Sequence, residues 1–221
     1  MSKKETEIYN FNAVIIGNFN PVIITPQWML NKGLIRETEA ENAKVIIIHP
    51  EICRFELDWL IFEASQTRID FKTKSESHFE ILRDLIISIF SALRETPLVS
   101  FGLNHLRHYT LRNTEEYINF GYWFSPVNQF ENVLRNPKLL NITFLEQGDI
   151  DKTDQGRYRV TISPSDLISD SKSIMININH HVENIPNGEA KHLINKLAEI
   201  WESSFNKVDE INSEIWNKVQ L

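Results

Sequence analysis

The 221-residue sequence predicts an α+β fold in which a mainly antiparallel sheet carries helices on one face. Two stretches, 11–97 and 98–207, show the same order of strand, short helix, three strands and long helix. Apolar and polar residues alternate in several segments, most clearly over 174–179, whereas the helical segments space their apolar residues three and four apart. We therefore expect a duplicated unit that forms one pseudo-symmetric domain, with a lead-in over 1–10 and a helical extension over 208–221.

Composition places the chain among globular proteins, since 42% of its residues are hydrophobic and 24% are charged. Its apolar runs are too short to cross a bilayer and its N-terminus lacks an apolar signal segment, so we expect a cytoplasmic protein without membrane contact. The single cysteine, Cys53, lies in an apolar strand pattern and is expected to be a small core residue. A net charge of −7 disfavours non-specific nucleic-acid binding, although a local basic patch remains compatible with it.

The first stretch begins with a strand over 11–19 and continues with a helix that Thr25 caps and Gly33 ends. Residues 36–42 are expected to form a surface loop. The β-branched run 44–57 predicts one strand, interrupted where Pro50 removes a backbone donor. A hairpin of strands 59–64 and 68–73 follows, and a capping box of Ser77 and Glu80 predicts the start of a long amphipathic helix that Pro97 terminates.

The second stretch predicts a strand over 98–111, a helix capped by Asn113, and strands over 139–145, 157–162 and 174–182. A final helix over 189–219 would be about 45 Å long at 1.5 Å per residue. That length exceeds a small domain, so we expect its last turns to contact another surface through Ile211, Ile215 and Trp216. We therefore expect a protein partner or a second copy of the chain to bind through this helix.

The predicted order of elements is similar to the doubled saddle of the TATA-binding protein. This is a resemblance of topology, and the chain has no sequence motif of that family. A helix-grip lipid-binding fold, which also ends in a long helix, is the alternative.

No motif nominates a catalytic residue or a cofactor site. His105 and His108 lie three apart on an expected strand and therefore face opposite sides, which argues against a shared metal. Adjacent histidines, His180 and His181, diverge for the same reason, so we expect no metal site. The aspartates of the loop 148–156 lack the central glycine and the final glutamate of a calcium loop, and a solvated hairpin loop is expected there.

Two glycine- and asparagine-containing turns are expected at related places of the two stretches. Glycine lets a partner backbone approach and asparagine offers both a donor and an acceptor, although both residues also serve turns locally. The expected helix after Asn113 carries the aromatic residues Tyr117, Phe120, Tyr122 and Trp123. This helix, the C-terminal helix and the two turns supply the candidate partner-binding residues: Asn18, Phe19, Asn20, Asn104, His105, His108, Tyr122, Trp123, Ile211, Ile215 and Trp216.

Three short motifs carry a second resemblance: Asn-Phe-Asn-Pro with the following Pro-Gln-Trp-Met-Leu, Leu-Arg-Asp-Leu-Ile, and Phe-Gly-Leu-Asn with the following His-Tyr. They resemble a sporadically distributed family of bacterial proteins to which no activity is assigned. The resemblance covers most of the chain and supplies no catalytic residue. A sporadic distribution implies an accessory function, such as phage defence or a toxin–antitoxin pair.

The leading hypothesis is a non-enzymatic protein-interaction subunit of a bacterial cytoplasmic complex. Nucleic-acid binding on the open sheet face is an alternative, for which the candidate cations are Arg54, Arg68, Lys72, Lys74, Arg157 and Arg159. A third hypothesis is a small-ligand binder or an enzyme with a cavity near His105, His108 and Tyr109.

Overall fold

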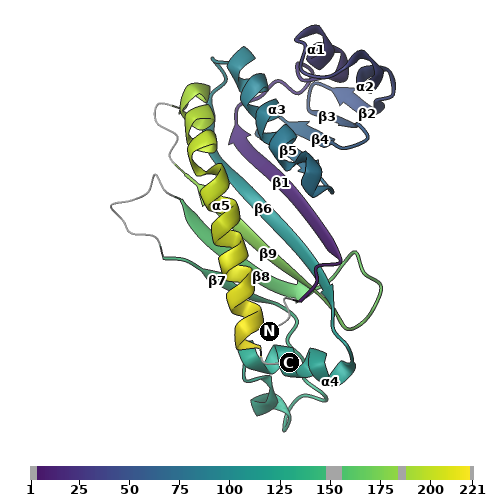
Figure 1. Cartoon of the computed structure of the whole chain (residues 1–221), viewed down its shortest axis with the longest axis vertical. Coiled ribbons are helices and arrows are strands. Elements are labelled where there is room, and N and C mark those ends of the chain that lie inside the picture. The colour runs from purple at the N-terminus through teal and green to yellow at the C-terminus, as the bar shows by residue number, and fades with distance from the viewer. Residues whose placement is uncertain (1–3, 148–155, 184–187, 220–221) are drawn as a thin grey trace.

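The α+β architecture expected from the sequence is present in the computed structural model, which describes residues 4–147, 156–183 and 188–219 (Figure 1). One nine-stranded antiparallel sheet has the strand order β2-β3-β4-β5-β1-β6-β9-β8-β7. Its strands are β1 (Ile8–Gly17), β2 (Lys44–His49), β3 (Ile52–Glu56), β4 (Ile61–Ser65), β5 (Arg68–Thr73), β6 (Leu98–Thr110), β7 (Ile142–Leu145), β8 (Arg157–Pro164) and β9 (Ser173–Val182). The helices are α1 (Pro26–Asn31), α2 (Glu37–Glu41), α3 (Phe79–Ala92), α4 (Thr114–Phe124) and α5 (Ala190–Lys218).

The strand order is symmetric about the boundary between β1 and β6. The first strand of each half, β1 or β6, lies at the centre of the sheet. The last strand of the same half pairs directly with it, β5 with β1 and β9 with β6. The halves are unequal, because the first contributes five strands and the second four. Such an order is compatible with the duplicated unit that the sequence predicts, and the duplication itself stays a prediction.

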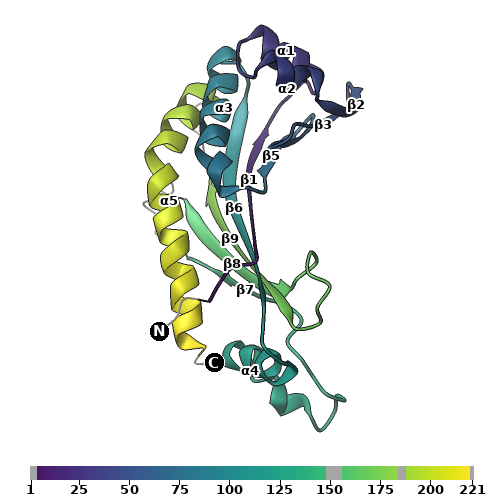
Figure 2. The same cartoon turned by 45° about the vertical axis from the view of Figure 1, so that its right-hand side comes forward.

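Helices α3 and α5 pack on the same face of the sheet, and no helix among the described residues lies on the opposite face of the central strands (Figure 2). Strand alternation explains this division. In β1, Phe11, Ala13 and Ile15 are buried under the helices, whereas the intervening Asn12 and Val14 point to the other side. We call this second side the open face.

Several local predictions are confirmed. Thr25 accepts a hydrogen bond from the Trp28 amide and caps α1, and Gly33 follows that helix with a φ of +67°. Asn113 caps α4 by accepting from the Glu116 amide at 2.8 Å. Cys53 is a free, fully buried cysteine.

Other local predictions are wrong. Residues 36–42 contain the short helix α2 instead of a loop, because Glu39 returns to cap the amide of Arg36. The run 44–57 forms two strands, β2 and β3, joined by a turn at Pro50. The capping box of Ser77 and Glu80 does not form, since α3 starts after a 3₁₀ turn and Glu80 accepts from the Trp201 indole at 2.8 Å.

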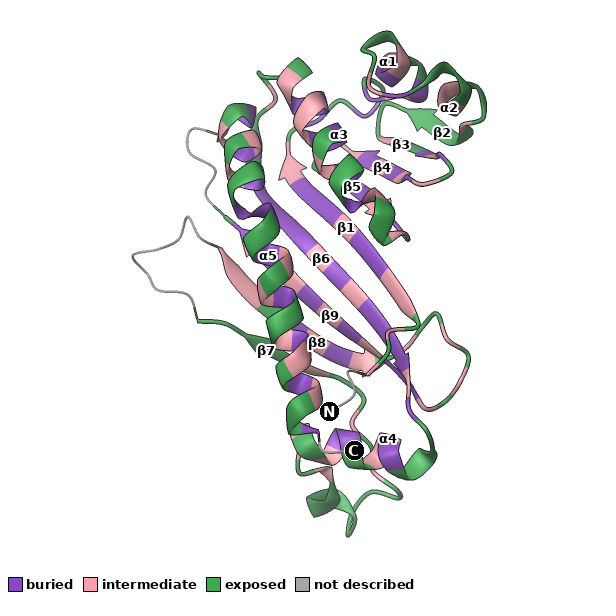
Figure 3. Cartoon of the chain, in the orientation of Figure 1, coloured by how far each residue is buried: buried purple, intermediate pink, exposed green. Residues whose placement is uncertain are grey.

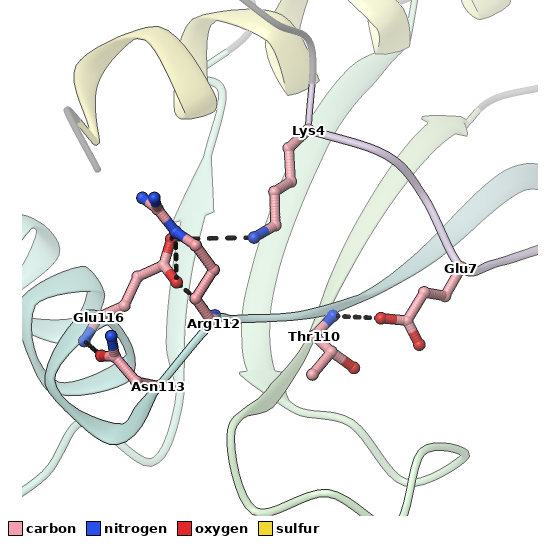
Figure 4. Close-up of polar contacts among 6 residues, drawn as sticks. All are labelled: Lys4, Glu7, Thr110, Arg112, Asn113 and Glu116. Atoms are coloured by element: carbon pink, nitrogen blue, oxygen red, sulfur yellow. Dashed lines mark hydrogen bonds and ion pairs between the residues drawn. The ribbon is translucent and has the colours of Figure 1, made fainter.

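The N-terminal lead-in is shorter than predicted, because β1 already begins at Ile8. The segment before it is fixed to the end of β6 (Figure 4). Glu7 accepts from the Thr110 amide at 3.0 Å, and Lys4 lies 3.8 Å from the buried carboxylate of Glu116. That carboxylate also accepts from the amide and the guanidinium of Arg112. Glu116 therefore ties the start of α4 to both the N-terminal segment and the segment that follows β6.

The C-terminal helix joins two hydrophobic clusters. Leu193, Leu197 and Trp201 belong to the larger cluster with α3 and the first half of the sheet, and Val208 and Ile215 belong to the cluster around α4, β8 and β9. The prediction that its last turns extend beyond the domain is wrong. Within the same chain, Trp216 lies edge-on to Tyr109 at 4.8 Å and against Phe120 at 5.5 Å, while Ile211 and Ile215 pack in the same cluster.

Polar contacts fix the position of α5 along the sheet. Ser204 is hydrogen-bonded to His180 at 3.0 Å, and Asn212 accepts from the Tyr109 hydroxyl at 2.7 Å. Both helix residues are buried, so a shift of the helix by one turn would leave these groups without their partners.

Tyr109→Phe tests this interpretation. We expect a loss of about 1–2 kcal/mol in the free energy of unfolding, because the variant leaves the buried Asn212 amide unsatisfied. Adding Asn212→Leu should recover part of that loss, measured by urea denaturation as a double-mutant cycle. Equal losses in the single and double variants would contradict it.

Candidate functional site

Five polar side chains form a line across the open face. The strand register pairs Lys72 of β5 with Asn12 of β1, Asn12 with Asn104 of β6, Asn104 with Asn179 of β9, and Asn179 with Arg159 of β8. We call these five residues the polar row. Three amides lie in its centre and one cation lies at each end. At about 4.8 Å between neighbouring strands, the two ends are about 19 Å apart.

The amides of the row leave hydrogen-bonding capacity unused. Asn179 donates to Asn104 Oδ1 at 2.8 Å, and Asn12 donates to Asp70 at 3.3 Å. Within the described residues, the buried Oδ1 atoms of Asn10, Asn12 and Asn177 have no hydrogen-bond partner. Buried amide oxygens normally accept hydrogen bonds, so these three are unsatisfied acceptors just beneath the surface of the open face.

A hollow of about 290 Å³ is lined by three residues of the row, Asn104, Asn179 and Arg159. Gly102 lies in it between Val14 and His181, where the strand register would otherwise place a side chain. A Cβ atom at Gly102 would meet the Asn179 amide nitrogen at 2.9 Å, so the glycine leaves space for the neighbouring asparagine. The other side chains that line the hollow are mostly polar or cationic, including Arg68, Asn104, Arg159, Thr161, Asn177 and Asn179.

The candidate cations for nucleic acid differ in their electrostatic state. Three are paired: Arg54 with Glu63 at 3.5 Å, Arg68 with Asp70 at 2.8 Å, and Arg157 with Glu183 at 2.6 Å. Among the described residues, Lys72, Lys74 and Arg159 form no ion pair. Lys72 and Arg159 are the two ends of the polar row, whereas Lys74 lies beyond the end of β5. The open face therefore carries few unneutralised cations.

His105 and His108 face opposite sides of β6, as their spacing predicts. His105 lies under α5, 4.5 Å from the Phe205 ring, and its Nδ1 is hydrogen-bonded to the Tyr9 hydroxyl at 2.7 Å. His108 lies on the open side, where its Nδ1 is hydrogen-bonded to Ser165 at 2.8 Å. Both rings are fully buried, and the described residues contain no cluster of three or more His, Cys, Asp or Glu side chains that could hold a metal ion.

Burial controls the ionisation of His105 and of Tyr9, whose hydroxyl is hydrogen-bonded to the His105 ring. Burial, together with the nearby Arg107 guanidinium, lowers the pKa of His105 to about 3, so the ring is neutral at pH 7. Burial also raises the pKa of Tyr9 to about 12. Arg107 lies over the Tyr9 ring at 4.4 Å and forms an ion pair with Asp209 of α5. These groups join the sheet to α5 and lie away from the open face.

The structure separates the other candidate partner-binding residues. The two predicted turns are not equivalent, because Asn18 and Asn20 follow the end of β1 whereas Asn104 lies in the middle of β6. Phe19 is buried in the larger hydrophobic cluster. Tyr122 and Trp123 line a wide groove along α4, where Trp123 is 55% exposed. The calcium-like aspartates at 149, 151 and 154 lie outside the described residues.

Asn12 and Asn179 are the residues of the polar row that sequence patterns did not single out as candidates. Their signal was present, since Asn177 and Asn179 alternate with buried isoleucines in β9 and Asn12 alternates with buried residues in β1. Only the register of five strands brings them into one row.

No family model matches this chain, and none of the curated proteins searched is recognisably similar to it. No helix among the described residues is long and apolar enough to cross a membrane.

Proposed function

We propose that this protein is a non-enzymatic interaction subunit whose partner binds across the open face. The polar row carries this proposal: three amides with a cation at each end, on a sheet face that carries no helix in the described part of the chain. Amide side chains pair with peptide groups, since each offers both a donor and an acceptor. The flanking cations favour a partner segment that carries acidic residues near both ends.

The dimensions of the row indicate the size of this segment. An extended peptide advances about 3.3 Å per residue, so the 19 Å between Lys72 and Arg159 corresponds to about six residues. The proposed ligand is therefore an extended, acidic segment of a partner protein, laid across the strands. An accessory function such as phage defence or a toxin–antitoxin pair, which the family resemblance implies, stays a prediction.

Charge reversal at one end of the row tests the proposal. Arg159→Glu should reduce recovery of the partner from the native host about tenfold, because it places a carboxylate against an acidic segment. Lys191→Glu is the matched control, since it makes the same charge change on an exposed position of α5. Quantitative proteomics of the tagged full-length chain compares both variants with wild type. Equal recovery of the same proteins with Arg159→Glu would overturn the proposal.

Nucleic acid is a second candidate for the same face. The observation that favours it is the pair of unneutralised cations, Lys72 and Arg159, at the ends of a row of amides that could contact base edges. Against it, three of the six candidate cations are neutralised by carboxylates and the chain has a net charge of −7. Fluorescence anisotropy with duplex and single-stranded oligonucleotides discriminates the two candidates. Salt-dependent binding that Arg159→Glu weakens would favour nucleic acid over the acidic peptide.

A further inference from the structure

The lining of the hollow on the open face is basic, although the chain has 30 aspartates and glutamates against 23 lysines and arginines. None of the described residues that line it is acidic, whereas Arg68, His181 and Arg159 are among them. Arg68 donates to Asp70 at 2.8 Å, and the His181 ring is hydrogen-bonded to Glu183 at 3.1 Å. Arg159 has no carboxylate partner among the described residues. The hollow therefore has a place for one anionic group.

Asn104 supplies a second donor to the same hollow. Its Oδ1 atom accepts from Asn179 at 2.8 Å, whereas its amide nitrogen donates to no other described residue. The strand register leaves only Asn179 between Asn104 and Arg159. A carboxylate accepts several hydrogen bonds at once, and bonds to a charged group are about twice as strong as neutral ones. The guanidinium and the amide are thus a suitable donor pair for a carboxylate.

The other wall of the hollow is apolar. Val14 and Ile16 of β1 line it, and Val14 is only 8% exposed although it lies on the open face. Between the two walls runs β6, which is buried over most of its length (Figure 3). Gly102 of this strand leaves the floor of the hollow without a side chain. Methylene groups of a ligand can lie on the apolar wall while its charged end reaches Arg159.

We propose that the hollow binds an aliphatic carboxylate, and that in the complex this group is the side chain of a glutamate in the acidic segment of the partner. The assignment rests on the function proposed above. The carboxylate accepts from Arg159 and Asn104, and the methylene groups lie on Val14 and Ile16. Sites for drug-sized ligands occupy about 300–1,000 Å³, so a hollow of about 290 Å³ suits one side chain. Gly102 is the specificity-determining residue, because any side chain there would occupy the floor.

A nuclear magnetic resonance titration of the isotope-labelled full-length chain tests the site. The probe is a blocked glutamate, N-acetylglutamate N-methylamide. We expect saturable shifts of the Gly102 amide and the Arg159 side chain, with a dissociation constant in the millimolar range for so small a ligand. The blocked glutamine should bind at least tenfold more weakly, because it lacks the charge. Shifts that do not saturate, equal binding of the blocked glutamine, or tighter binding of inorganic phosphate would each overturn the proposal.

Variants locate the bound carboxylate. Arg159→Gln should weaken binding of the blocked glutamate at least tenfold, because it removes the charged donor. Lys72→Gln is the matched control, since it removes the same charge from the other end of the polar row and Lys72 does not line the hollow. Both variants should retain the wild-type circular dichroism spectrum. Equal affinity of the two variants for the blocked glutamate would overturn the assignment to Arg159.

Gly102→Val tests the floor of the hollow. A Cβ atom here meets the end of the Asn179 side chain, which can move, so we expect the variant to fold with the hollow filled. Binding of the blocked glutamate should fall at least tenfold, and recovery of the partner from the native host should fall with it. Loss of the blocked glutamate with unchanged recovery of the partner would show that the hollow serves a free acid, and would overturn the assignment to a partner side chain.

The two proposals fail separately. If the blocked glutamate does not bind while Arg159→Glu still reduces recovery of the partner, the carboxylate site is wrong and the open-face interaction stands. If the blocked glutamate binds while Arg159→Glu leaves recovery unchanged, the proposed interaction is wrong, and with it the assignment of the hollow to a partner side chain.

Discussion

Trp201→Ala should lower the free energy of unfolding by about 3–5 kcal/mol, the range for truncation of a buried large aromatic side chain. Trp201 is 2% exposed and lies where α5, α3 and β1 meet. Its ring lies edge-on to Phe11 at 5.3 Å, and its indole nitrogen donates to Glu80 of α3 at 2.8 Å. The truncation therefore removes contacts between all three elements at once. The loss is measured by urea denaturation, monitored by far-ultraviolet circular dichroism because the substitution changes the tryptophan fluorescence.

A second tryptophan supplies the control. Trp123 is 55% exposed on α4, so Trp123→Ala should change stability by less than about 0.5 kcal/mol. Glu80→Gln separates packing from ionic character, because the amide oxygen can still accept from the indole. We expect it to cost less than about 1.5 kcal/mol, since a charge-assisted bond becomes a neutral one. A cost for Trp201→Ala no larger than that for Trp123→Ala would contradict the position of α5.

The sequence correctly predicted the strands and helices that are defined by a regular spacing of apolar residues. The alternation of β5 and β9 and the apolar spacing of α3 and α5 each follow from one repeating period, and the structure has all four. The β2–β3 turn was missed for a physical reason. Its two strands form one almost continuous β-branched run, in which Pro50 could mark a bulge as well as a turn.

Two other predictions failed because of contacts between residues that are far apart in the sequence. The capping box failed because Glu80 is engaged by Trp201, a residue 121 positions away. The end of α5 was expected to need a second surface because nothing local revealed that Tyr109 of β6 and Phe120 of α4 would pack against Trp216. Both outcomes depend on tertiary packing, which overrides local preference.

The candidate site shows the same limit. Lys72 and Arg159 could be named as candidate cations for nucleic-acid binding and Asn104 as a partner-binding residue, so the cations and the amide were assigned to different hypotheses. Their positions in one row depend on the pairing of β5, β1, β6, β9 and β8, which spans most of the chain. A single-residue shift in any of these registers would move an amide or one of the end cations to the buried face. The site is therefore a property of register and could not be predicted from sequence motifs.

Acidification should destabilise the protein through His105. The pKa of this imidazole is lowered to about 3 in the folded chain by burial, by the Arg107 guanidinium and by His180, whereas an unfolded chain has an ordinary value near 6.5. Between these two values the unfolded chain binds more protons than the folded chain. The free energy of unfolding therefore falls as the pH falls from 6.5 toward 3, with a slope that approaches about 1.4 kcal/mol per pH unit. Above pH 6.5 this group contributes no slope.

His105→Gln isolates this contribution, because glutamine cannot take up a proton in this range. The variant loses some packing against Phe205 and is expected to be less stable than wild type at pH 7. Its stability should then decline less steeply between pH 6.5 and 4, so the wild-type and variant curves converge on acidification. His108, whose pKa burial also lowers, contributes to the slope that remains in both curves. Parallel curves from urea denaturation would show that His105 accepts a proton in the folded chain and would contradict its burial beneath α5.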